Sequence, residues 1–220
     1  MSNLELVSVH IPKTGGISVR RVLERKYGKR LGLDYPPART QGLANGLMSL
    51  PGRLRTRLQA RSMRCVHGHF PARKYAAGAA EMMVFVRDPI ELRASTWHYV
   101  RREHARQGSR NPDWESAMTM EIEEFILTQS RTYREYLGQV PMHRFAFVGT
   151  IEHFDQDLAR LCERLGVAHR PVRENSNPAG SDYNLDSGIK HRFRQENPQE
   201  YELYEAALQR RDELLCKVAA

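Results

Sequence analysis

The feature that most constrains the fold is a short apolar segment, residues 4–9, followed by a glycine turn and then by helical spacing. The segment is rich in aliphatic and β-branched residues, which predicts a buried strand. Pro12 ends this strand. Gly15 and Gly16 allow a tight turn that brings the backbone close to a ligand. From Ile17 onward apolar residues recur at helical spacing, so the sequence predicts a strand, a tight turn and a helix N-terminus in succession.

This arrangement is suited to phosphate, because free N–H groups and the positive end of the helix dipole face the anion. Lys13 adds a mobile positive charge, and Thr14 and Ser18 add hydroxyl donors. The segment is not a Walker A motif, in which the lysine follows the glycines. For this segment alone, the alternative is an ordinary strand–turn–helix with a surface lysine.

The length of 220 residues suffices for one α/β domain with a packed core, so we expect a single domain, 1–220. The formal net charge of +8 predicts an anionic partner such as a nucleotide, a sulfated or phosphorylated ligand, nucleic acid or a membrane surface. The three cysteines are widely spaced, which favours a reducing compartment over a disulfide framework. No signal peptide or transmembrane segment is recognisable, so we expect a soluble, cytoplasmic protein.

Two histidines follow the next predicted strand. Residues 28–61 contain turn signals without periodicity, and we interpret them as a flap on the substrate side. Residues 63–66 predict a strand that ends at His67 and His69, whose imidazoles are expected to face one cleft. A metal site is disfavoured because no nearby Asp, Glu or third His completes a ligand set. Structural histidines and a general base remain as alternatives.

A third motif follows the apolar strand predicted at 82–86. Asp88 is a favourable helix N-cap and Pro89 a favourable first helical residue. Ser95 lies eight residues after Arg87, so both side chains are expected on one side near the carboxyl end of the strand. An arginine fork with a hydroxyl suits a phosphate monoester. The alternative is an Arg87–Asp88 pair that caps the helix.

A fourth strand is predicted at 144–149, an amphipathic helix at 152–165 that ends at Gly166, and a helical tail. We therefore expect an α/β fold of three layers, with a mainly parallel central sheet, flanking helices and a P-loop-like nucleotide-binding topology. Each motif lies at the carboxyl end of a strand, where open parallel sheets bind ligands.

Together the motifs resemble those of sulfotransferases that use 3′-phosphoadenosine 5′-phosphosulfate (PAPS). Pro-Lys-Thr-Gly-Gly-x-Ser at 12–18 resembles their 5′-phosphosulfate loop. Val-Arg-Asp-Pro at 86–89, followed after five intervening residues by Ser95, resembles their 3′-phosphate motif, although Leu92 stands where a second arginine is usual and Arg93 follows it. His-Gly-His at 67–69 is similar to the motif of glycan 2-O-sulfotransferases. The closest similarity is to that branch and to bacterial sulfotransferases. Val-Gly-x-x-Glu at 148–152 and the polar stretch 173–178 resemble the family more weakly.

The resemblance implies in-line transfer of a sulfuryl group from PAPS to an acceptor hydroxyl, with release of adenosine 3′,5′-bisphosphate (PAP). It implies that His69 is the catalytic base, assisted by His67, and that Lys13 stabilises the transition state. No metal is required. The implied residues that bind PAPS are Pro12, Lys13, Thr14, Gly15, Gly16, Ile17, Ser18, Arg87 and Ser95.

The acceptor and the oligomeric state have no readable signal. A carbohydrate, a lipid, a small alcohol or a peptide tyrosine would each supply the hydroxyl. Two other function classes stay open. A P-loop-like phosphotransferase or nucleotide-binding protein would prefer ATP with Mg²⁺, although the Walker lysine is missing. A basic nucleic-acid-binding module fits the charge, but no recognition helix, zinc pattern or aromatic signature supports it, so we expect no nucleic acid partner.

Overall fold

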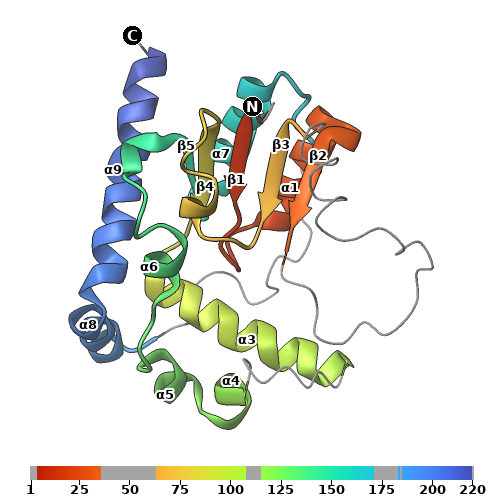
Figure 1. The fold of residues 1–220 in the computed structure, drawn as a ribbon. Helices are drawn as coiled ribbons and strands as arrows, with labels where there is room; N and C mark the ends of the chain where they lie inside the picture. Colours follow the sequence, from red (N-terminus) through yellow and green to blue (C-terminus); the bar gives the residue numbers. More distant parts are fainter. Residues whose placement is uncertain (1–3, 36–62, 108–114, 171–182, 184, 220) are drawn as a thin grey trace.

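The computed structural model describes residues 4–35, 63–107, 115–170, 183 and 185–219. In this part of the chain, five parallel strands form one sheet in the order β2-β3-β1-β4-β5 (Figure 1). The expected α/β class with a parallel central sheet is confirmed. The strands are β1 (Leu6–Val9), β2 (Leu31–Asp34), β3 (Cys65–Gly68), β4 (Glu81–Val86) and β5 (Phe145–Thr150).

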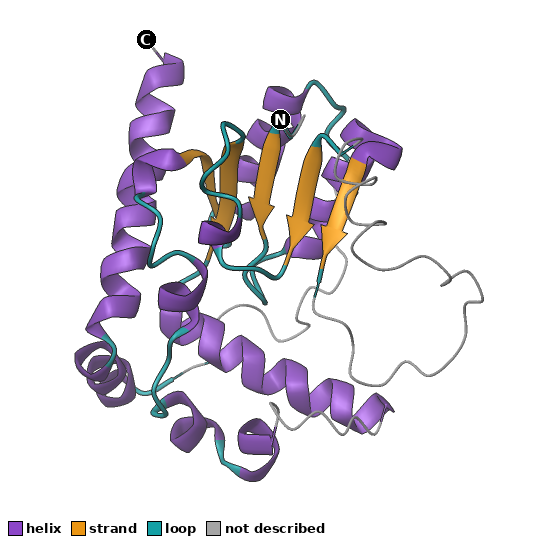
Figure 2. Cartoon of the chain, viewed as in Figure 1, coloured by secondary structure: helices purple, strands orange, loops and turns teal. Residues whose placement is uncertain are grey.

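Helices lie on both sides of the sheet (Figure 2). In the described ranges, none of the helices combines the length and the apolar character needed to cross a membrane. The helices are α1 (Gly16–Tyr27), α3 (Pro89–Gln107), α4 (Glu115–Thr119), α5 (Ile122–Ile126), α6 (Thr132–Tyr136), α7 (Phe154–Leu165), α8 (Ser187–Glu196) and α9 (Pro198–Ala219), with 3₁₀ turns at Gly28–Arg30, Ala72–Lys74 and Met142–Arg144.

The side chains of β4 alternate between two hydrophobic clusters, as expected for a strand buried on both faces. Met82 and Val84 belong to a cluster that α6, α8 and α9 close. Met83 and Phe85 belong to a second cluster that α1 and α7 close. The sheet is therefore the middle of the three layers predicted from the sequence.

The interpretation of residues 28–61 as a flap is wrong at its beginning, where β2 pairs in parallel with β3. Four residues, one of them Gly32, carry too little periodicity to announce a strand, and the pairing with β3 supplies the order. Gly68 permits this pairing, because a Cβ there would lie 1.9 Å from the Asp34 carbonyl oxygen. The rest of the predicted flap, from residue 36 onward, lies outside the described residues.

The central strand β1 lies at the point where the chain changes direction across the sheet. After β1 the chain continues to β2, on one side, whereas after β4 it continues to β5, on the other. The loops that follow β1 and β4 therefore diverge, and open parallel sheets bind ligands at such a position. Helix α3 runs across this edge, beneath the carboxyl ends of the strands (Figure 1).

A buried carboxylate, Asp157 in the first turn of α7, joins three elements. Its oxygens accept hydrogen bonds from the Thr150 backbone N–H at 2.8 Å and from Arg211 Nε and Nη2 of α9 at 2.8 and 2.9 Å. Arg160 Nη1 donates at 2.8 Å. Asp157 is fully buried. This network holds α9 and α7 against the end of β5.

Candidate functional site

The residues after β1 form a tight loop, 10–15, which we call the β1 loop. Lys13 and Gly15 have left-handed backbones, with φ of 68° and 73°. A Cβ on Gly15 would lie 2.4 Å from the Phe154 ring, so glycine is required there. The Thr14 hydroxyl donates to the Ile11 carbonyl at 2.8 Å. This hydroxyl, expected as a donor for a ligand, thus shapes the loop.

The β1 loop leads into the N-terminus of α1 at Gly16, as predicted. No acidic residue lies in the first turn, so nothing there offsets the positive end of the helix dipole. Ser18 is buried beneath the turn, Pro12 is partly buried, and Ile17 is exposed. The predicted phosphate-binding segment therefore has the expected form, with its backbone N–H groups at the carboxyl edge of the sheet.

Positive charge is concentrated beside this helix N-terminus. Lys13 Nζ lies 4.1 Å from the centroid of the Tyr99 ring on α3, a cation–π contact. Burial, together with Arg102 and Arg87, lowers the pKa of Lys13 to about 8. Glu103 acts in the opposite direction. A group of cations that repel one another in this way gains stability when an anion binds between them.

Arg87 and Ser95 lie at the end of β4 and on α3, and both are buried. The Arg87 backbone exchanges two hydrogen bonds with the Tyr133 hydroxyl, at 2.8 and 2.6 Å. Its guanidinium lies 5.6 Å from the Tyr183 ring and 3.8 Å from the Glu91 carboxylate. The guanidinium is therefore held by α3 and by the ring of Tyr183 at the switch point of the sheet.

Asp88 caps α3, as predicted. Its Oδ1 accepts from the backbone N–H groups of Ile90 at 3.0 Å and Glu91 at 3.2 Å. The Asp88 N–H donates to Glu152 Oε1 at 2.8 Å, which ties the loop after β5 to the turn after β4. The Arg87 guanidinium pairs with Glu91, and the helix cap forms through the Asp88 side chain.

Arg93, whose role the sequence left open, contacts α5. Its Nη2 donates to the Phe125 carbonyl at 2.6 Å and to the Thr128 hydroxyl, and its guanidinium lies 4.0 Å from the Phe125 ring. Leu92 is part of the core. Arg93 therefore joins α3 to α5, while Arg87 is the arginine at the sheet edge.

The two predicted histidines lie at the same edge but in different surroundings. His67 is almost fully buried, and its Nδ1 shares a 2.8 Å hydrogen bond with Ser8 Oγ on the paired strand. His67 therefore does not face an open cleft, whereas the alternation of the strand had led us to expect that it would. His69, just after β3, is only partly buried.

A third histidine, His10, lies beside them in the fold, although it is distant from them in the sequence. Its ring stacks on His67 with centroids 5.0 Å apart and lies 4.4 Å from the His69 ring. Tyr35 completes the group, with its hydroxyl 3.0 Å from His10 Nδ1. Within the described ranges, no set of three His, Cys, Asp or Glu side chains is arranged to hold a metal ion.

The three imidazoles are neutral at pH 7. Burial lowers the pKa of His67 and of His69 to about 4. Burial and then the other two imidazoles lower the pKa of His10 to about 2. The Nε2 atom of His69 is covered and has no hydrogen-bond partner in the described part of the chain. A buried polar atom without a partner at such an edge is typical of a ligand or catalytic site.

Two residues at this edge of the sheet, Tyr99 and His10, could have been found from the sequence. Tyr99 lies four residues after Ser95, so both share one face of α3. His10 directly follows β1, at the edge where Lys13 and His69 were expected to meet. The weak match at 173–178 lies outside the described residues.

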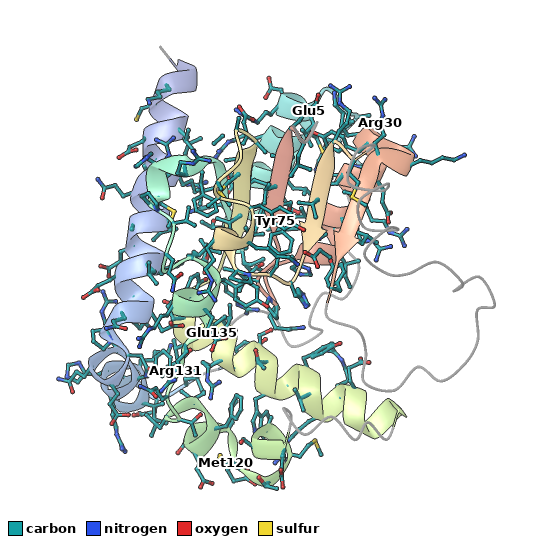
Figure 3. The ribbon with its side chains drawn as sticks, in the orientation of Figure 1. Glu5, Arg30, Tyr75, Met120, Arg131 and Glu135 are labelled. Atoms are coloured by element: carbon teal, nitrogen blue, oxygen red, sulfur yellow. The ribbon has the colours of Figure 1, made fainter. Side chains whose placement is uncertain are left out.

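Side chains fill the space between the carboxyl ends of the strands and α3 (Figure 3). This edge of the sheet combines a helix N-terminus, a concentration of positive charge and neutral imidazoles. The first two favour an anion, and a neutral imidazole accepts a proton. This chemistry suits transfer of a group from an anionic donor to a hydroxyl.

Comparison with known proteins gives a fold. No family model matches the chain, and no curated protein matches it in sequence. The structure is similar to mouse sulfotransferase SULT7A1, solved in complex with PAP, with a TM-score of 0.50 and 14% identity over 98% of this chain and 88% of that one. It also matches a sulfotransferase from Alicyclobacillus acidocaldarius, with a TM-score of 0.47 and 16% identity over 97% and 96% of the two chains. The chain thus has a sulfotransferase-like P-loop fold.

Proposed function

We propose that this protein transfers a sulfuryl group from PAPS to an acceptor hydroxyl, with a carbohydrate among the acceptors to be tried. The observation that carries the proposal is the meeting of Lys13 and Arg87, from the loops after β1 and β4, beside the N-terminus of α1 and a group of neutral imidazoles. The likeness of the fold to a sulfotransferase that was solved with PAP supports the choice of nucleotide.

Each residue has a role in the proposed reaction. The N–H groups at the start of α1 and the Lys13 ammonium hold the 5′-phosphosulfate, and Arg87 and Ser95 hold the 3′-phosphate. His69 takes the proton of the acceptor hydroxyl as its oxygen bonds to sulfur and the bond from sulfur to the bridging oxygen breaks. Lys13 stabilises the negative charge that develops on that bridging oxygen as PAP leaves.

Thermal unfolding in the presence of nucleotides tests the proposed function without knowledge of the acceptor. PAP at about one hundred times its Kd should stabilise the protein by about 2.7 kcal/mol. For a chain of this length, that is a rise in Tm of roughly 5–10 °C. ATP with Mg²⁺ at the same concentration is the control. A rise with ATP and Mg²⁺ alone would point to a phosphotransferase, and no rise with either nucleotide would contradict the proposal.

Replacement of Arg87 by alanine should weaken PAP binding because a charge-assisted hydrogen bond to the 3′-phosphate is lost. Such a bond contributes about 1.5–3 kcal/mol, which is roughly a 10–150-fold rise in Kd. Titration calorimetry measures it. Adenosine 5′-phosphate, which lacks the 3′-phosphate, is the matched ligand, and its Kd should change less than about threefold. Equal losses for both ligands would exclude a specific contact with the 3′-phosphate.

The affinity for PAP should depend on pH through Lys13. Its pKa of about 8 means that the ammonium is charged at pH 7 and loses its proton as the pH rises through 8. The affinity should therefore be nearly constant between pH 7 and 7.5 and should fall between pH 8 and 9.5. In the Lys13→Arg variant, the guanidinium stays charged and the fall should disappear. A wild-type affinity that is constant up to pH 9.5 would show that Lys13 does not hold the anion.

A further inference from the structure

His10 lies between the two halves of the proposed site. A Cβ on Gly16 would lie 1.8 Å from His10 Nε2 and 2.1 Å from its Cδ2, so the imidazole rests directly on the first residue of α1. The same ring lies 4.4 Å from the ring of His69, tilted by 54°. One side chain thus contacts both the helix N-terminus proposed for the phosphosulfate and the proposed base.

The position of His10 is fixed from two further directions. The Tyr35 hydroxyl lies 3.0 Å from His10 Nδ1, which sets the rotation of the imidazole. His67 stacks on His10 with an interplanar angle of 12° and is itself tied to Ser8. His67, predicted as the assistant of His69, therefore supports His10 from the interior of the sheet.

The His69 ring contacts both His10 and Tyr35. The Tyr35 ring meets His69 edge-on, with centroids 4.7 Å apart and an angle of 75°. Side chains packed this closely have few voids, and a displacement of one is transmitted to its neighbours. A ligand that settles over Gly16 would lie next to the His10 ring, and a shift of that ring would be transmitted to His69.

We propose that His10 is a positioning residue that couples occupation of the α1 N-terminus to the orientation of His69. The inference rests on the proposed function in taking His69 as the base and PAP as the ligand. His10 was not among the site residues expected from the sequence, and the inference gives it a role between the nucleotide site and His69. It also gives a reason for glycine at position 16, since a Cβ there would displace the His10 ring that couples the nucleotide site to His69.

The test is the imidazole signals of the full-length, ¹⁵N-labelled protein with and without PAP, assigned by replacing each histidine in turn. Melting curves of the same samples report binding. In the wild type, PAP should shift the His69 signals. In His10→Ala, PAP should still raise Tm, but the shift at His69 should fall several-fold, and His10→Phe, which keeps a ring there, should restore part of it. His143→Ala, in an exposed 3₁₀ turn outside this group of rings, should respond like the wild type.

The outcomes separate the inference from the proposed function. If PAP raises Tm but His69 does not move, or moves equally in His10→Ala, the coupling is wrong and the nucleotide site stands. If PAP does not bind the wild type, the proposed function fails, and titration of His69 without nucleotide decides the positioning role. Its pKa, which burial lowers to about 4 in the wild type, should be the same in His143→Ala and should rise toward its ordinary value in His10→Ala, where a ring that covers it is gone. The same pKa in all three would overturn the inference.

Discussion

Replacement of His69 by alanine is expected to lower the rate of sulfuryl transfer about 10²–10⁴-fold, the usual contribution of a general base. The Kd of PAP should change less than about twofold, because the proposed role places the imidazole at the acceptor rather than at the nucleotide. The rate is measured as transfer of label from PAPS to the member of a hydroxyl panel (sugars, phenols and alcohols) that the wild type sulfates best. Loss of PAP binding in the variant would instead mark His69 as structural.

A distant histidine supplies the matched control. His143 is exposed in a 3₁₀ turn before β5, and His143→Ala should transfer at the wild-type rate. The pH profile gives a second check. Because burial lowers the pKa of His69 to about 4, the base is neutral at pH 7, and kcat/KM should fall only as the pH drops through about 4. A fall centred near 6.5 would indicate a solvated histidine as the base.

Replacement of Asp157 by alanine should have the largest effect on stability. The change leaves the Thr150 N–H and the Arg211 guanidinium without their acceptor. Breaking a buried ion pair on one side costs about 3–5 kcal/mol, which for a chain of this length is a fall in Tm of roughly 6–20 °C. Calorimetry or circular dichroism measures the change.

Asp155 offers a control in the same helical turn. It is exposed and is one of the acidic residues at the start of α7, so Asp155→Ala removes the same charge near the same dipole. Its effect on the free energy of unfolding should stay within about 0.5 kcal/mol. A double variant, Asp157→Ala with Arg211→Met, should recover part of the loss because the unpaired guanidinium is gone. Equal Tm values for Asp157→Ala and Asp155→Ala would refute the structural role of the hydrogen bonds around Asp157.

The sequence predicted the parts of the fold that carry local signals. The apolar segments that became β1, β4 and β5 are buried on both faces, so a run of apolar residues identified each of them. The cap at Asp88 and the stop at Gly166 were also readable, because both depend on nearby backbone. The roles of Lys13 and His69 stay predictions for the experiments above.

What the sequence could not provide depends on contacts between distant segments. β2 is a strand because β3 lies beside it, and its four residues show no alternation that would predict this. Arg93 found its partners on α5, and no pattern within α3 announces them. The burial of His67 follows from Ser8 on the neighbouring strand, a contact set by register.

The central place of β1 has a consequence for how the protein is made. β1 emerges from the ribosome before its two neighbours, β3 and β4, which end only at residues 68 and 86. At about 5–20 residues per second, several seconds pass before both partners exist. During that interval an apolar strand waits unpaired, and pairing distant segments is slow. The segment proposed to bind the nucleotide is thus synthesised early and fixed late, so this nascent chain should depend on chaperones more than one whose first strand pairs with the second.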